Sequence, residues 1–267
     1  MKILVIYHSG VGSTKLVAKL IAKEMEVIGI GADVCSIEEK HDISEYDLLC
    51  IGFPTYHAEP SKSIVNYIEQ LSEYACRKEK CAFIFTTCGL YSGNALRIFA
   101  KKCIQKNIIP IYDSVYKSAA TDGTLLLPKW KIIQKFQKNI DEKIKKDIKN
   151  FIEASKKRKK KTPRFKIHAI LNAPNKWAGK RFSPSIYLHK ECCIKCNKCV
   201  RNCLYQCLTY NEEGYPIYEK ENCEHCYRCI HYCPNQALTI LKNKAVTVQL
   251  NEKFFTQYEA SIKRKWK

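Results

Sequence analysis

Eight cysteines near the end of the chain form a repeat, and this repeat restricts the fold more than any other feature. Ten of the sixteen cysteines lie between Cys192 and Cys233. In each half of the repeat, two residues separate the first three cysteines and three residues precede the fourth, which places three thiolates on one tight loop. The first half consists of Cys193, Cys196, Cys199 and Cys203, and the second half consists of Cys223, Cys226, Cys229 and Cys233.

The spacing leaves three kinds of site open: iron–sulfur clusters, zinc sites and disulfides. Disulfide frameworks belong to small secreted chains. This chain has 267 residues, and its first apolar run is shorter than a signal peptide core and leads into a Gly-rich turn. Zinc sites commonly use two separated CxxC pairs, which a CxxCxxC triplet followed by a fourth cysteine fits poorly. The spacing therefore favours iron–sulfur clusters.

Residues 186–242 resemble the bacterial ferredoxins that hold two [4Fe–4S] clusters, in which the fourth cysteine of each run binds the other cluster. The sequence departs from that family at Leu204, where proline is usual, and at Cys207, where a small apolar residue is usual. We expect Cys207 and Cys192 to be thiols that pack against their neighbours or take no part in the site. The alternative for Cys192 is that it competes as a ligand. His225 and His231 are expected at the surface or beside a cluster rather than as ligands. The resemblance implies one cluster on Cys193, Cys196, Cys199 and Cys233, and another on Cys223, Cys226, Cys229 and Cys203.

Up to about residue 127, apolar runs alternate with amphipathic stretches, which is typical of βαβ units. A 267-residue chain also leaves room for about two domains. The pattern predicts an α/β domain with a doubly wound, five-stranded parallel sheet. The expected strands are Lys2–Tyr7, Asp33–Ile37, Asp47–Gly52, Cys81–Thr86 and Ile109–Val115, and the expected helices are Ser13–Ile28, Ser61–Glu73 and Ser92–Gln105.

Three loops would meet at the carboxyl edge of this sheet, where doubly wound folds bind ligands. The first is a Gly-rich loop with hydroxyls that opens a helix, a pattern typical of a phosphate cradle. It matches neither the nucleotide P-loop nor the GxGxxG spacing. The other two loops each carry an aromatic residue that can stack on a flat ring. The candidate cofactor-binding residues are Ser9, Gly10, Val11, Gly12, Ser13 and Thr14, then Pro54, Thr55, Tyr56 and His57, then Thr87, Cys88, Gly89, Tyr91 and Gly93.

The three loops read SGVGST, GFPTYHAEP and TTCGLYSG in this order, and with them residues 1 to about 155 resemble flavodoxin. The resemblance implies FMN, with its phosphate in Ser9–Thr14 and its isoalloxazine ring beside Tyr56 and Tyr91. Val11 departs from the usual hydroxyl residue and removes one phosphate hydrogen bond. The alternatives are a flavodoxin-like fold without flavin and a packing role for each tyrosine. The early cysteines other than Cys88 are expected to be small buried hydrophobic residues. For Cys88, participation in redox chemistry is an alternative.

Much of the net charge of +20 lies in one segment, because residues 128–166 hold 16 Lys/Arg and 4 Asp/Glu, a net of +12. Isoleucine or phenylalanine recurs there every four residues, which predicts one long basic helix over 128–161, ended by Pro163. Its last turn, Lys156–Lys161, has no interleaved aromatic residues, so we expect a solvated helix end or a docking patch for an acidic partner rather than a nucleic-acid site. No apolar run approaches the roughly 20 residues of a membrane span. The expected domain plan is a first domain at 1–161, a linker at 162–185 packed through Trp177 and Phe182, the cysteine-rich domain at 186–242, and a basic tail at 243–267.

Together, the two regions resemble the flavodoxin–ferredoxin fusion proteins of anaerobes, including the EFR-type ferredoxins. The resemblance implies a cytoplasmic electron-transfer protein that relays electrons between FMN and two [4Fe–4S] clusters. Its expected partner is an acidic redox protein, such as a ferredoxin or a ferredoxin-dependent oxidoreductase. One alternative is an FMN-dependent reductase of a quinone, nitro compound or disulfide, fed by the clusters. A second alternative is a nucleic-acid-binding iron–sulfur protein. No residue is singled out as catalytic.

Overall fold

The structure is a computed structural model of the chain, and it describes all residues except 40, 73–75, 168–184, 243–245, 247 and 264–267. The chain divides into two compact units, each of which is described by itself. The second unit takes in two short segments from the N-terminal half of the chain. The first unit consists of Met1–Ser9, Ser13–Ser118 and Phe136–Pro174, and the second consists of Gly10–Gly12, Ala119–Lys135 and Asn175–Lys267.

A parallel sheet forms the middle of the first unit. Its strands follow the order β2-β1-β3-β5-β6, and the two-residue strand β4 pairs antiparallel with β3. This confirms the predicted five-stranded parallel sheet of a doubly wound α/β domain. The strands are β1 (Ile3–Tyr7), β2 (Ala32–Ser36), β3 (Leu48–Tyr56), β4 (Glu59–Pro60), β5 (Lys80–Cys88) and β6 (Ile108–Lys117).

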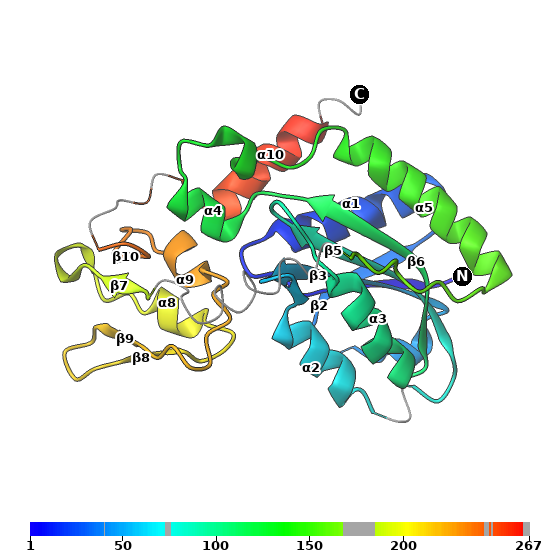
Figure 1. Cartoon of the computed structure of the whole chain (residues 1–267), viewed down its shortest axis with the longest axis horizontal. Helices are drawn as coiled ribbons and strands as arrows, with labels where there is room; N and C mark the ends of the chain where they lie inside the picture. The colour runs from blue at the N-terminus through cyan, green and yellow to red at the C-terminus, as the bar shows by residue number, and fades with distance from the viewer. Residues whose placement is uncertain (40, 73–75, 168–184, 243–245, 247, 264–267) are drawn as a thin grey trace. The chain divides into compact units, whose positions relative to one another are not determined.

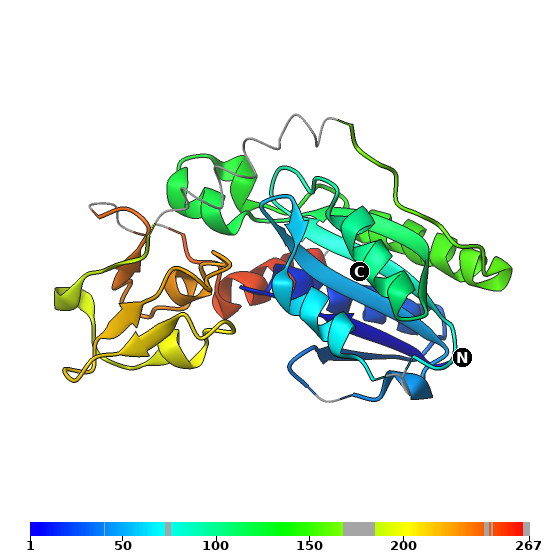
Figure 2. The ribbon, with the colours of Figure 1, turned by 60° about the horizontal axis from the view of Figure 1, so that its bottom comes forward.

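Helices cover both faces of this sheet. α1 packs beside α5 on one face, and α2 packs beside α3 on the other (Figures 1 and 2). The central strands β1 and β5 are buried along their whole length, because a parallel sheet covered on both faces is buried on both faces. The helices are α1 (Ser13–Val27), α2 (Lys62–Gln70), α3 (Ala95–Gln105) and α5 (Ile140–Lys157), with a 3₁₀ turn at Ile43–Glu45.

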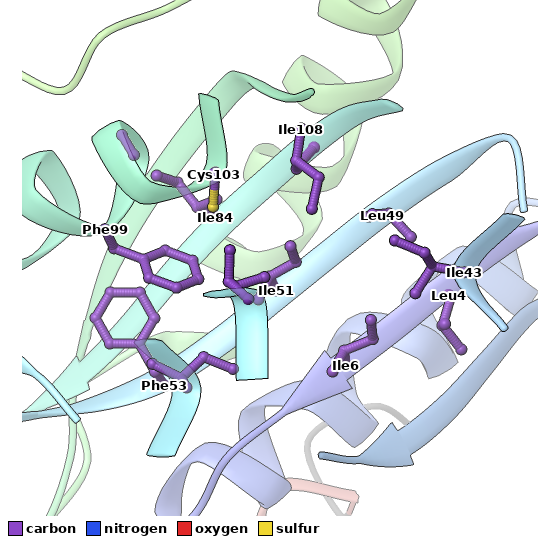
Figure 3. Packing of buried hydrophobic residues seen from close by; sticks show 14 of the residues in the cluster. Leu4, Ile6, Ile43, Leu49, Ile51, Phe53, Ile84, Phe99, Cys103 and Ile108 are labelled. Carbon is purple, nitrogen blue, oxygen red and sulfur yellow. The ribbon is translucent and has the colours of Figure 1, made fainter. Parts of the chain in front are cut away.

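The apolar core between the sheet, α2 and α3 holds the strand ends in place. All nine residues of β5 are buried. The rings of Phe53 and Phe99 lie 4.5 Å apart between their centroids, so β3 and α3 are in direct contact (Figure 3). Burial of an aromatic side chain contributes roughly 1.5–3 kcal/mol. The core therefore fixes the ends of β1, β3 and β5, from which the three candidate loops start.

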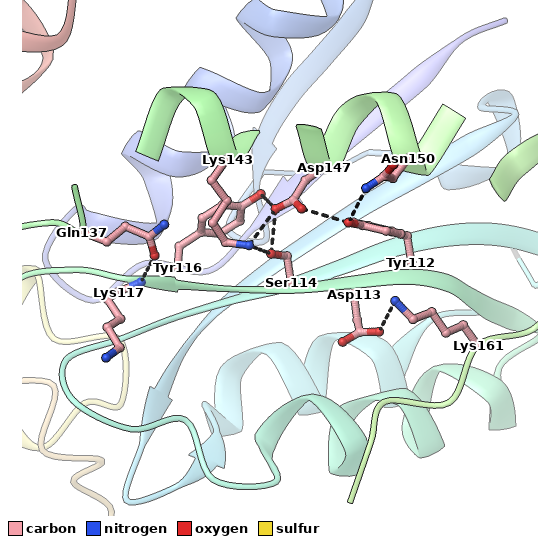
Figure 4. A network of polar contacts seen from close by, with 10 residues as sticks. All are labelled: Tyr112, Asp113, Ser114, Tyr116, Lys117, Gln137, Lys143, Asp147, Asn150 and Lys161. Carbon is pink, nitrogen blue, oxygen red and sulfur yellow. Dashed lines mark hydrogen bonds and ion pairs between the residues drawn. The ribbon is translucent and has the colours of Figure 1, made fainter. Parts of the chain in front are cut away.

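A buried polar network fastens α5 to the edge strand β6 (Figure 4). Asp147 of α5 is 4 % exposed, and its carboxylate accepts hydrogen bonds from the hydroxyls of Tyr112 (2.9 Å), Ser114 (2.7 Å) and Tyr116 (2.8 Å). The Lys143 ammonium lies 3.1 Å from the same carboxylate. A buried charge is tolerated when it is paired and fully hydrogen-bonded, and this network meets both conditions.

The predicted helix over 128–161 is wrong at both ends. Residues 121–134 form the short helix α4 (Thr121–Leu126) and a 3₁₀ turn (Lys131–Gln134), and Asn139, in the left-handed region at φ 52°, starts α5. Ile132 is one of the residues expected on the apolar face of the predicted helix, but it is 78 % exposed. Its neighbour Ile133 is only 4 % exposed. α5 ends at Lys157 because Arg158 is left-handed at φ 46°. The error arose because isoleucine or phenylalanine keeps recurring every four residues across Asn139, although the helix begins only there.

The second unit preserves the cysteine repeat in its backbone. Strand β7 pairs with β10, and β8 pairs with β9, both antiparallel. Left-handed residues recur 30 positions apart, with Lys195 matching His225 and Gln206 matching Gln236. The elements are β7 (Tyr187–Leu188), a 3₁₀ turn (Lys190–Cys192), α8 (Lys198–Arg201), β8 (Leu208–Tyr210), β9 (Pro216–Tyr218), α9 (Arg228–His231), β10 (Leu238–Thr239) and α10 (Glu252–Lys263).

Among the described helices, none combines the length and the apolar character that crossing a bilayer would require. The expected linker is described at 162–167, which belongs to the first unit, and at Ser185. Arg97 donates a 3.2 Å hydrogen bond to the carbonyl of Pro163. Residues 168–184, with the packing expected for Trp177 and Phe182, lie outside the described residues.

Candidate functional sites

Threonine hydroxyls tie together the strand ends that carry the candidate cofactor loops. The Oγ1 atoms of Thr14 and Thr87 lie 2.8 Å apart, and so do those of Thr55 and Thr86. The first pair joins the start of α1 to β5, and the second pair joins β3 to β5. The structure thus brings Thr14, the last residue of the predicted first loop, and the predicted second and third loops to one edge of the sheet. Thr14 and Thr87 are buried, and their hydroxyls form a hydrogen bond with each other.

The start of α1 is suited to an anion. The Ser13 Oγ is buried and has no hydrogen-bond partner in the part of the chain that the structure describes. The first turn of α1 contains no acidic residue, and a helix N-terminus carries free N–H groups and a partial positive charge. The preceding residues Gly10–Gly12 group with the second unit. There, the Val11 carbonyl accepts a 2.8 Å hydrogen bond from the Tyr232 hydroxyl.

The second candidate loop is a tight hairpin between β3 and β4. Pro54, Thr55 and Tyr56 are the last residues of β3. His57 and Ala58 form the two-residue turn, and both have positive φ (49° and 63°). Such turns normally use Asn-Gly, so His57 and Ala58 hold strained conformations of the kind that cluster at functional sites.

The third candidate loop packs directly against this hairpin. A Cβ added to Gly93 would lie 2.5 Å from the Ala58 Cβ, and Gly93 itself has φ 52°. Only glycine fits this approach and this backbone conformation. Thr87 and Cys88 belong to β5, and Gly89 follows the strand directly. Tyr91 is partly buried, and burial raises the pKa of its hydroxyl.

Cys88 is a buried thiol rather than a reactive thiolate. Burial raises its pKa to about 11, while the charges of Lys166 and Lys117 act in the opposite direction. A cysteine reacts as its thiolate, so this environment does not favour redox chemistry at Cys88. The other early cysteines are buried, as predicted, in strands, helices and the segment before β5: Cys35, Cys50, Cys76, Cys81 and Cys103.

Lys166 lies at the third loop, and the sequence analysis missed it. Its Nζ donates a 2.8 Å hydrogen bond to the Ser92 Oγ and lies 5.5 Å from the centroid of the Tyr91 ring. Asn94 holds the backbone of Lys166 through a 2.9 Å hydrogen bond from the Lys166 N–H. The sequence contains no signal for this role, because Lys166 is one of many lysines in a basic segment.

In the second unit, one pocket is lined by five cysteines, four of which belong to the repeat. They are Cys193, Cys196 and Cys199 from the first half, Cys233 from the second half, and Cys192, which directly precedes the repeat. Burial raises the pKa of the Cys199 thiol to about 11, and Cys233 and Cys196 contribute to the rise. The Ala237 N–H donates a 3.2 Å hydrogen bond to the Cys233 Sγ.

The other four repeat cysteines form a second group. Burial raises the pKa of Cys226 to about 12, and the nearby Cys223 and Cys203 contribute to the rise. Cys229 behaves in the same way, with its pKa well above the ordinary value. The Cys203 Sγ accepts a 3.3 Å hydrogen bond from the N–H of Cys207, which corresponds to the bond from Ala237 to Cys233 at the equivalent position of the repeat.

The extra cysteines and the two histidines differ in exposure. Cys207 is buried and Cys192 is exposed. Both His225 and His231 are buried, which excludes the surface location expected as one possibility. Within the described ranges, no three His, Cys, Asp or Glu side chains converge as ligands of a single metal ion; the four cysteines of the first group instead surround a hollow.

The fold and the strand-end loops of the first unit define a flavodoxin-like α/β protein. A family model for the flavodoxin domain matches residues 4–162, and the chain belongs to this family. The family assignment supports FMN as the cofactor of the first unit.

Solved structures that are similar to the chain include flavodoxins and a larger oxidoreductase. A flavodoxin from the domain Archaea is 17 % identical over 59 % of this chain and 98 % of its own, with a TM-score of 0.44. The Megasphaera elsdenii flavodoxin is 18 % identical over 58 % and 98 %, with a TM-score of 0.43. Rubredoxin oxygen:oxidoreductase from Desulfovibrio gigas is 16 % identical over 58 % of this chain but only 36 % of its own, with a TM-score of 0.45. No curated protein matched the chain.

Proposed function

We propose that the chain is an electron-transfer flavo-iron–sulfur protein, in which FMN held by the first unit exchanges electrons with two [4Fe–4S] clusters held by the second. One observation carries the proposal. Cys233, from the second half of the repeat, lines the same pocket as three cysteines of the first half. This exchange of the fourth ligand between halves is the arrangement that two-cluster ferredoxins use.

The two cysteine groups suit clusters better than bare thiols. Burial disfavours the negative thiolates of Cys226 and Cys229, and iron supplies the compensating positive charge. Backbone N–H groups donate to Cys203 and Cys233, and such hydrogen bonds to sulfur help to set the potential of a cluster. Four thiolates around a hollow suit a cubane with one thiolate on each iron, whereas zinc requires its ligands to converge on one point.

The first unit supplies groups suited to a phosphorylated flavin. The Ser13 hydroxyl and the start of α1 would hold the phosphate, while the hairpin at His57 and the loop at Tyr91 would border the ring. FMN passes electrons one or two at a time, whereas a cluster passes one. Lys166, beside Tyr91, would stabilise negative charge on a reduced ring. With a net charge of +20, the chain is suited to an acidic redox partner.

Cofactor analysis of protein purified under anaerobic conditions tests the proposal. We expect about eight irons and one FMN per chain. Replacement of a ligand, Cys193→Ala, should reduce the bound iron, whereas replacement of its neighbour, Cys192→Ala, should leave the iron content unchanged. Zinc in place of iron, or equal iron loss in both variants, would contradict the assignment of the cysteines.

A further inference from the structure

The two halves of the cysteine repeat are equivalent in backbone but opposite in environment. In the first half, Ile194 is 59 % exposed and Lys195 and Arg201 are also exposed. Thirty residues later, the equivalent positions are Glu224 (7 % exposed), His225 (7 %) and His231 (0 %). One half of the repeat thus faces solvent, and the other faces protein.

The second half is buried by contacts within its own unit. Tyr227 and Ile230 belong to an apolar cluster that includes Leu125 of α4. The His231 ring connects α4 to the C-terminal segment. Its Nε2 donates a 3.0 Å hydrogen bond to the Thr121 carbonyl, and its Nδ1 accepts a 3.1 Å hydrogen bond from the N–H of Leu250. α4 and the C-terminal segment therefore cover the second half of the repeat at Tyr227, Ile230 and His231, whereas the repeat cysteines of both halves are partly buried.

The charges of the two halves differ as well. Residues 190–203 hold four Lys/Arg and one Glu, a net of +3, whereas residues 220–233 hold two Lys/Arg and two Glu, a net of zero. Lys195 and Lys198 line the pocket of the first cysteine group, and Arg201, which ends α8, is exposed. We call these three residues the basic rim. Lys190 is not counted, because it pairs with Glu213 at 3.1 Å.

We propose that the pocket of Cys193, Cys196, Cys199 and Cys233 is the docking site for an acidic redox protein, with Ile194 as its apolar centre and the basic rim around it. The inference rests on the proposed function, because it requires a cluster in this pocket. In the transfer, one electron leaves the reduced centre of the partner, which is oxidised, and enters this cluster, which is reduced. The second cluster, in the half of the repeat that α4 and the C-terminal segment cover, would then be the inner member of the pair.

Electron transfer from a reduced acidic [2Fe–2S] ferredoxin tests the proposal. The rate is followed as loss of the reduced [2Fe–2S] EPR signal after rapid freezing, with the intact, iron-loaded chain. In a variant with Lys195→Gln, Lys198→Gln and Arg201→Gln, the second-order rate constant at low salt should fall about tenfold or more, since charge steering contributes factors of 10 to 1,000. Its dependence on ionic strength should become weaker.

A control variant removes equal charge elsewhere, with Lys156→Gln and Lys157→Gln at the exposed end of α5 and Lys159→Gln just beyond it. It should change the rate constant less than about twofold. A control that loses as much as the rim variant, or a rim variant with full iron and the normal rate, would overturn the docking site. If the triple rim variant loses iron, the single changes Lys195→Gln and Lys198→Gln take its place, each with an expected decrease of about twofold to threefold. Wild-type protein without iron would contradict the proposed function itself, so the two failures are distinguishable.

Discussion

Gly93 shows how one position controls two of the candidate cofactor loops. In a Gly93→Ala variant, the new methyl group would meet Ala58 at 2.5 Å, and the φ of 52° would be strained. We expect a stability loss of about 1–3 kcal/mol and weaker FMN binding, because the loop must move away from the hairpin. Urea unfolding and flavin fluorescence titration measure the two effects.

Gly31→Ala is the matched control for Gly93→Ala. A Cβ at Gly31 meets nothing within 4 Å, so this change should leave both stability and flavin affinity nearly unaltered. Equal effects from the two substitutions would show that the contact between Gly93 and Ala58 does not shape the site.

Lys166 is the second side chain with a specific expected effect. Lys166→Gln removes the charge beside Tyr91 and weakens the 2.8 Å hydrogen bond to Ser92. Hydrogen bonds from charged groups contribute about 1.5–3 kcal/mol. Because the loss of this one would loosen the loop that borders the proposed flavin ring, the dissociation constant of FMN should rise about tenfold or more. Flavin fluorescence quenching measures it. Lys160→Gln, at an exposed position, removes the same charge, and an equal rise there would indicate a nonspecific charge effect.

The sequence is informative about single residues where the chemistry depends on spacing along the chain. The repeat spacing predicts the eight cysteines as cluster ligands, and the ferredoxin resemblance implies the pairing of Cys233 with the first half. The sequence pattern does not reveal Lys166 or the burial of His231, because both depend on contacts with segments far away in the chain. Lys166 reaches Ser92 across 74 positions, and His231 reaches Thr121 across 110.

The attachment of α5 to β6 depends on one buried carboxylate. Asp147→Ala leaves the hydroxyls of Tyr112, Ser114 and Tyr116 without their acceptor and Lys143 without its ion pair. Breaking a buried charge network costs about 3–5 kcal/mol, and we expect a loss of stability of that order. Urea unfolding followed by far-UV circular dichroism measures it.

Asp113→Asn provides the comparison on the same strand. Asp113 pairs with Lys161, whose side chain is 48 % exposed, and exposed ion pairs contribute only about 0–1 kcal/mol. The expected loss is therefore small. If Asp147→Ala were no more harmful than Asp113→Asn, the buried network would not be what secures α5.

Helices and strands could be predicted from the sequence where the spacing of apolar residues reflects one environment along the whole element. The central strands satisfy this condition best, because β1 and β5 are buried along their whole length. β3 and β5 nevertheless run longer than expected, to Tyr56 and Cys88, because pairing between neighbouring strands carries the sheet into the polar residues of the loops, as at Pro54 and Thr87. The prediction of one long basic helix was wrong because residues 128–135 belong to the second unit, where Lys131–Gln134 form a 3₁₀ turn.

The two units should respond differently when iron is removed. The first unit has an extensive apolar core around its sheet, whereas the apolar cluster of the second unit is small. Binding of a metal cofactor is coupled to folding when the protein part alone buries little. Treatment with acid and a chelator should therefore abolish amide hydrogen-exchange protection over 186–242 while β1 and β5 stay protected. Retained protection in the second unit would show that the cysteines do not organise it.

Electron flow between the cofactors tests the central claim of a relay most directly. Clusters reduced by a rapid pulse of a one-electron reductant under anaerobic conditions should reoxidise as the flavin spectrum changes, with matching amplitudes in stopped-flow. Because both cofactors belong to one chain, the rate should be independent of protein concentration. A flavin that is indifferent to the redox state of the clusters, or a rate that rises in proportion to protein concentration, would contradict an intramolecular relay.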